Sequence, residues 1–217
     1  RRASALLLLL ALALSGCAAP AEKTQAEKTA AYLMDTVTEP SCGSVGGEWA
    51  VIGLARAGCA VKDGYFEGYY DRLCETLRAC GGVLDARKNT EYSRVILALT
   101  AIGKDPSDVA GYDLLLPLAD HEQTLWQGLN GPIWALIALD AGAYAIPQTV
   151  SGTQASRARY VQTILDAQTE NGAWGLAAGS EDVDMTAMAL QALAKYTDDD
   201  AVNAAVERAL DWLSTQQ

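Results

Sequence analysis

The segment PIWALIALDAGA, residues 132–143, decides the interpretation of the fold. Its side chains are apolar on nearly every side of a helix, and a helix of that kind is normally buried on every side. Three other segments have the same character: WAVIGLARAGC at 49–59, SRVILALTAIGK at 93–104 and TAMALQALAKYT at 186–197. The chain therefore predicts an internal repeat of buried helices.

The spacing of these helices indicates what lies between them. When Leu54, Leu99, Leu139 and Leu193 are taken as equivalent, the repeats are 45, 40 and 54 residues long, which is the length of a helix pair with its loops. Residues 66–80, 156–168 and 200–215 form more amphipathic helices between the buried ones, and strand signals are sparse.

Buried and amphipathic helices in alternation predict two concentric layers. Each inner helix packs its outward side on an outer helix and turns its other side to a central cavity. We therefore expect an all-α fold, an α/α toroid of about four helix pairs over residues 40–217. A closed ring holds more pairs, so we also expect further repeats beyond residue 217.

Short signals place the helix ends. Asp105-Pro106 and Gly131-Pro132 each predict a helix start, because Pro suits the first helical position. Gly103 and Gly142 are predicted to adopt the left-handed conformation that ends a helix. The run Asp198-Asp199-Asp200 is predicted to cap a helix rather than to bind calcium.

The first residues resemble an export signal. Arg1 and Arg2 precede an apolar run over 5–14 that is too short to span a bilayer but suits a signal-peptide core. The run ends in Leu14-Ser15-Gly16-Cys17, which resembles the cleavage box of bacterial lipoproteins. The resemblance implies a signal peptide over 1–16, a lipid anchor on Cys17 at the extracytoplasmic face of the bacterial cell membrane, and a tether with an N-terminal helix over 17–39, with the tether itself at 18–28.

Composition excludes several functions. The 217 residues include 16 basic and 27 acidic side chains, a net charge of −11, and no basic patch of the kind that nucleic-acid binders carry. His121 is the one histidine, which excludes a His-rich metal site. We predict no metal and no cofactor. Cys42, Cys59, Cys74 and Cys80 permit two disulfides, or they are four buried free thiols.

Two motifs carry a family resemblance. Gln168, Gly172 and Trp174 have the spacing Q-x-x-x-G-x-W, which resembles the structural repeat of squalene–hopene cyclases. There the Gln amide bonds exposed backbone groups at a helix end, and Trp covers that end. Asp182-Val-Asp-Met-Thr-Ala187 then resembles the D-x-D-D-T-A of the same enzymes, with Met185 in place of the last Asp.

The wider resemblance, over residues 40–217, is to the terpenoid cyclase and protein prenyltransferase superfamily. It is nearest to exported bacterial proteins with prenyltransferase-like repeats. The stretch Asp184–Leu193 is also similar to part of the cobalamin carriers. The resemblance implies a surface protein that binds a small hydrophobic or corrinoid-like ligand, or a protein or glycan partner, with no catalysis that the sequence demonstrates. Residues expected to line the site are Trp49, Gln127, Asn130, Trp134, Asp184 and Met188.

Alternatives remain open. In a class II terpenoid cyclase, Asp184 would be the proton donor, whereas our structural interpretation is that Asp184 caps the fourth buried helix. A prenyltransferase would hold zinc with Asp, Cys and His, but His121 beside Asp120 has no partner Cys at a suggestive spacing. A thioester domain needs C-G-E-Q, and Cys42-Gly43-Ser44-Val45 lacks the Glu-Gln. A glycosidase would need opposed carboxylates, for which Glu48, Glu91 and Asp184 are candidates.

Overall fold

The computed structural model describes residues 24–216, and within that range the chain is all-helical, as predicted. Four helices lie side by side in a row: α3 (Gly47–Arg56), α5 (Asn89–Ala101), α7 (Asn130–Ala141) and α9 (Val183–Leu193). The other long helices are α2 (Gln25–Thr36), α4 (Tyr65–Ala79), α8 (Arg157–Asp166) and α10 (Asp200–Ser214). Three short helices precede α7: η1 (Leu116–Ala119), α6 (His121–Thr124) and η2 (Leu125–Gln127).

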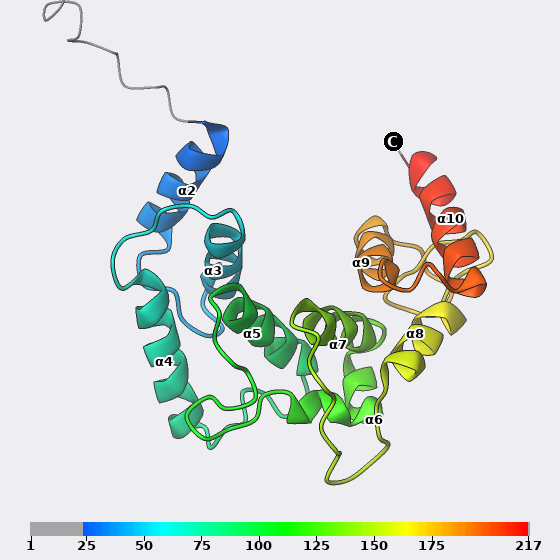
Figure 1. The fold of residues 1–217 in the computed structure, drawn as a ribbon. Coiled ribbons are helices and arrows are strands. Elements are labelled where there is room, and N and C mark those ends of the chain that lie inside the picture. The colour runs from blue at the N-terminus through cyan, green and yellow to red at the C-terminus, as the bar shows by residue number, and fades with distance from the viewer. Residues whose placement is uncertain (1–23, 217) are drawn as a thin grey trace, which may run out of the picture.

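The helices are bent into an arc (Figure 1). The row of α3, α5, α7 and α9 follows the inner side of the arc, and α4, α6 and α8 lie on its outer side. Amphipathic helices follow α3, α7 and α9 as expected, whereas only the short helices η1, α6 and η2 lie between α5 and α7 among the described residues. Within the described range, no helix is long and apolar enough to cross a bilayer. The predicted signal peptide and Cys17 lie outside the described residues.

The row helices run parallel to one another. At one end, the side-chain oxygen of Gln127, just before α7, accepts a hydrogen bond of 3.0 Å from the backbone N–H of Thr90 in the first turn of α5. At the other end, Asp140 near the end of α7 accepts hydrogen bonds from Lys195 and Tyr196, which follow α9. The N-terminal ends of the row helices therefore meet at one rim of the arc, which we call the amino rim.

The sequence predicts that the row helices are buried on every side, and this prediction is wrong. On α7, residues such as Ile133, Leu136 and Leu139 are fully buried. A strip at three-residue steps, which includes Trp134 and Ile137, stays partly exposed. The same strip continues on the neighbouring helices. The partly exposed residues, which we call the inner face, are Trp49, Ile52, Arg94, Leu97, Trp134 and Ile137.

Several predicted helix ends are confirmed. Gly103 has φ +71°, and Lys104 N–H bonds back to the carbonyl of Leu99. The Asp198–Asp200 run starts α10, where Asp199 accepts hydrogen bonds from the N–H groups of Ala201 and Val202. The carboxylate thus serves as an N-cap, as predicted.

Other predicted ends are wrong. No helix starts at Asp105-Pro106, because Asp105 accepts from both the N–H and the hydroxyl of Ser107 and closes a turn instead. Gly142 has φ −117°, and the left-handed residue after α7 is Ala143 at φ +52°. Residues 25–28 of the predicted tether belong to α2, which Thr24 and Glu27 start with a capping box.

The cysteines match neither alternative fully. Cys42, Cys59, Cys74 and Cys80 are all free thiols, so neither disulfide is formed. Cys74 is buried, Cys42 and Cys59 are half-buried and Cys80 is exposed. The alternative of four buried thiols therefore holds for Cys74 alone.

Gln168, Gly172 and Trp174 form the brace that their spacing predicts. The Gln168 amide donates to the carbonyls of Gly172 and Ala205, each at 2.8 Å. Trp174 is fully buried, and its indole N–H donates to the carbonyl of Ile164 in α8 at 2.7 Å. This motif therefore ties the end of α8 to α10 and supports the loop that leads into α9.

Candidate functional site

Two tryptophans meet on the inner face near the amino rim. Trp49 lies in the first turn of α3 and Trp134 in the second turn of α7. Their rings make an edge-to-face contact with centroids 5.6 Å apart, although α5 lies between the two helices. Trp49 nevertheless stays 49% exposed. A large aromatic surface open to solvent is expensive to leave uncovered, so this pair is a candidate contact for a ligand.

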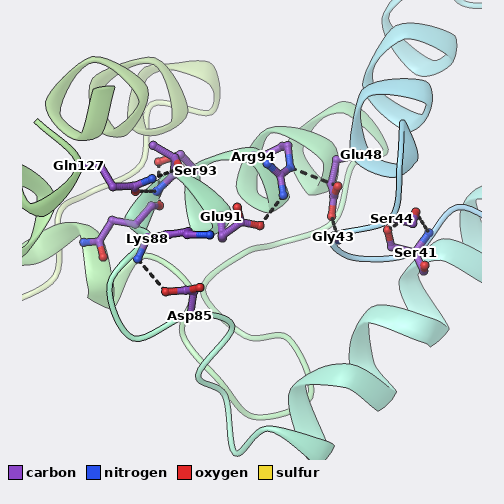
Figure 2. Close-up of polar contacts among 12 residues, drawn as sticks. Ser41, Gly43, Ser44, Glu48, Asp85, Lys88, Glu91, Ser93, Arg94 and Gln127 are labelled. Carbon is purple, nitrogen blue, oxygen red and sulfur yellow. Dashed lines mark hydrogen bonds and ion pairs between the residues drawn. The ribbon is translucent and has the colours of Figure 1, made fainter. Parts of the chain in front are cut away.

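A polar cluster lies at the same end of α3 and α5 (Figure 2). Arg94 donates from Nε to Glu48 at 3.2 Å and from Nη2 to Glu91. Glu48 is almost fully buried, while the side chains of Arg94 and Glu91 keep about a quarter of their surface exposed. Two carboxylates face one guanidinium, so the cluster carries a net negative charge at neutral pH.

Glu48 also organises the loop that precedes α3. Its Oε1 accepts from the backbone N–H of Gly43 at 2.9 Å, and the Ser44 hydroxyl donates to the carbonyl of Ser41 in the same loop. Burial lowers the pKa of Arg94, but the carboxylates of Glu48 and Glu91 more than offset this effect and raise it above its usual value. Arg94 therefore stays charged and holds both carboxylates in place.

Two further groups border this cluster and are unsuited to catalysis. Burial, followed by the charge of Glu48, raises the pKa of the Cys42 thiol to about 12. A thiol with that pKa is not a nucleophile near neutral pH. The Tyr69 hydroxyl is buried without a hydrogen-bond partner among the described residues, and burial raises its pKa as well.

The predicted site residues separate into two groups. Trp49 and Trp134 are in contact, and Gln127 lies nearby at the amino rim, where its amide also donates to the Thr90 hydroxyl at 3.0 Å. Asn130 is half-buried at the start of α7. On α9, Met188 is half-buried against the core and Asp184 is exposed.

The expected cap at Asp184 is wrong. Asp182 is the N-cap of α9, and its carboxylate accepts from the N–H of Met185 at 2.8 Å. Thr186 lies in the first turns of α9, and its hydroxyl accepts from Trp174 N–H and donates to the Asp182 carbonyl. The motif thus joins α9 to the Trp174 brace, and Asp184 is left in solvent.

The carboxylates proposed for glycosidase chemistry do not converge. Glu48 and Glu91 come together, but they do so on one arginine, whereas Asp184 contacts neither. Within residues 24–216, no group of His, Cys, Asp and Glu side chains is arranged to hold a metal ion. The sequence reasoning missed Arg94, although Glu91 and Arg94 at i and i+3 on one helix were a signal for it.

A comparison with known families, curated proteins and solved structures finds no match to this chain.

Proposed function

We propose that this protein is an exported, lipid-anchored surface protein whose helical arc, a partial α/α toroid, binds a small ligand on its inner face and does no chemistry on it. The observation that carries the proposal is the contact of Trp49 with Trp134, because it joins two indoles of the inner face while Trp49 stays 49% exposed. Such surfaces suit a ligand with a flat or ring-shaped apolar face, of which a corrinoid is one example.

The chemistry around the tryptophans supports binding over catalysis. Glu48 and Glu91 are both engaged by Arg94, and the Cys42 thiol is held protonated. A general acid or nucleophile needs a group whose pKa and access suit its task, and neither of these groups offers that. The polar groups instead suit a positioning role at the edge of an apolar platform.

Native mass spectrometry tests the binding role. The protein is purified from its own membrane fraction and compared with the same sample after denaturation. We expect a ligand mass that is retained by the Trp126→Ala variant and lost from Trp49→Ala. Trp126 is the matched control because it is 57% exposed and lies outside the aromatic pair. Ligand-free protein, or equal loss from both variants, would contradict the proposal.

The lipid anchor needs its own test. We expect the mature wild-type protein to carry the mass of a diacylglyceryl group on Cys17 and a Cys17→Ser variant to lack it. An unmodified Cys17 in protein from the membrane fraction would remove the basis for the proposed location.

The alternative activity, a terpenoid cyclase with Asp184 as the acid, gains no support from the surroundings of that residue. Asp184 is exposed, whereas an acid that protonates an alkene needs neighbours that hold its proton. Turnover of a polyprene by the wild type and its loss in Asp184→Asn would restore this alternative.

A further inference from the structure

A cavity lies at the amino rim, and neither residue of the tryptophan pair lines it. It has a volume of about 690 Å³, within the range of ligand-binding pockets. Three segments form its walls: the junction of η2 and α7, the end of α8 with residues 167–171, and the loop over 175–181 that leads to α9. None of the residues expected to form the binding site lines it, and Gln168, which does line it, was assigned a structural role.

The mouth of this cavity is apolar. Leu125, just before α7, and Leu176, in the loop that leads to α9, both line it and are 39% and 63% exposed. Leu129, deeper in the wall, is buried. The lining also includes several small residues, which are Gly128, Gly175, Ala177, Ala178 and Gly179. Such walls leave backbone groups accessible and allow an extended chain to approach closely.

The charge of the cavity has one sign. Asp166, Glu170 and Glu181 line it, and no Lys, Arg or His from the described residues does so. Arg208 does not line the cavity, but it donates to the side-chain oxygen Oε1 of Gln168, which does. A cationic ligand group in this cavity would therefore meet carboxylates, and no lining residue is a cationic side chain that would repel it.

Hydrogen bonds within the chain hold the walls in shape. Glu181 accepts from Thr169 and Asn171 at 3.0 and 2.8 Å, and from the indole N–H of Trp212 in α10 at 3.2 Å. The Ser180 hydroxyl closes the loop on the Ala177 carbonyl at 2.7 Å. A preorganised wall reduces the entropy lost when a ligand binds.

We propose that this cavity binds a peptide segment in which a lysine or arginine side chain lies between apolar side chains. The apolar neighbours contact Leu125 and Leu176, and the cation lies by Asp166 and Glu170, whose oxygens are less fully engaged than those of Glu181. Opposite charge and apolar contact together select this occupant over a neutral lipid or an anion.

Calorimetric titration with two synthetic peptides tests the proposal. The first is an acetylated, amidated peptide of alternating leucine and lysine, five residues long, and the second has the same sequence with both lysines acetylated on Nζ. We expect the charged peptide to bind at least about ten-fold more tightly. Its affinity is expected to fall as salt rises from about 50 to about 500 mM.

Variants of the chain assign the effect to the cavity. Combined Asp166→Asn and Glu170→Gln should abolish the preference for the charged peptide, while Glu67→Gln on α4 should leave it unchanged. Leu176→Ser should lower the affinity for both peptides. Leu210 is a similarly exposed leucine on α10, and Leu210→Ser should leave both affinities unchanged. Equal affinity for the two peptides, or equal effects of Leu176→Ser and Leu210→Ser, would overturn the proposal. Trp49→Ala should not change peptide binding, so this test is independent of the inner-face ligand.

Discussion

Trp49 on α3 and Trp134 on α7 touch edge to face across α5, with ring centroids 5.6 Å apart. Helix α5 lies between α3 and α7 and packs on both of them. The two indoles therefore meet across the partly exposed strip of α5. The contact also fits α3 and α7 running in the same direction, since both indoles lie near helix N-termini. This contact is thus consistent with parallel row helices, and it forms the aromatic part of the inner face.

The two carboxylates that share Arg94 are predicted to differ in their importance for stability. Glu48 has a nearly buried side chain, so Arg94→Met, which leaves that carboxylate unpaired, should lower the free energy of unfolding by about 3 kcal/mol. Glu91 is a quarter exposed and i,i+3 to Arg94, so Glu91→Gln should cost less than about 1 kcal/mol. Urea unfolding measures both, and equal losses would show that Glu48 is not the organising partner.

Crowding at Gly172 predicts an intolerant position. Gly172 has φ +94°, and a Cβ there would lie 2.8 Å from the carbonyl oxygen of Arg208. Gly58 is the matched control, because it has φ +62° and nothing within 4 Å of its Cβ position. Gly58→Ala should cost about 1 kcal/mol from backbone strain alone. Gly172→Ala should cost clearly more, and thermal unfolding that ranks the two variants equally would contradict the brace.

The fold of the row was largely predictable from sequence, and its inner face was not. Apolar segments such as 132–143 fixed where the buried helices lie, because burial on most sides leaves a clear pattern. The Gln168–Trp174 brace was also predictable, because its residue types form their hydrogen bonds within a short span. The Glu48–Arg94 pair joins residues 46 positions apart, and a single sequence does not encode such long-range pairing in its periodicity.

The cap of α9 shows how a helix cap can be assigned two residues too late from sequence. Asp182 and Asp184 are both acidic residues at the start of the apolar segment, so either could be the N-cap. The hydrogen bond from the Met185 N–H to the Asp182 carboxylate identifies Asp182 as the N-cap. Asp182→Ala should therefore lower stability by about 1 kcal/mol, as removal of an N-cap does. Asp184→Ala should change it by less than about 0.5 kcal/mol, as for exposed sites. A larger loss from Asp184→Ala in chemical denaturation would reverse this assignment.

His121 is predicted to make stability depend on pH. Burial, with a contribution from the charge of Arg159, lowers its pKa, against the opposing effects of Glu122 and Asp120. Its ring lies beside Tyr160, and Nε2 bonds the Thr163 hydroxyl at 2.9 Å. The folded state thus favours neutral imidazole, so this contribution is present above the unfolded pKa of about 6.5 and is lost as pH falls toward the lower folded value.

The measurement is urea unfolding of the wild type and of His121→Gln at about pH 7.5 and about pH 5.5. The wild type should lose stability between these values, and the variant should lose less. If the two proteins show the same difference, the dependence belongs to the carboxylates and not to His121.

Oxidative footprinting of the tryptophans tests the inner-face binding site most directly. Protein purified from its native membrane fraction is labelled with hydroxyl radicals before and after the ligand is stripped, and oxidation of each indole is followed by mass spectrometry. We predict that Trp49 and Trp134 are oxidised more slowly before stripping, while Trp126, exposed at the amino rim, is oxidised at the same rate in both samples. Equal rates at Trp49 in the two samples, or protection confined to Trp126, would contradict the assignment of the inner face as the binding site.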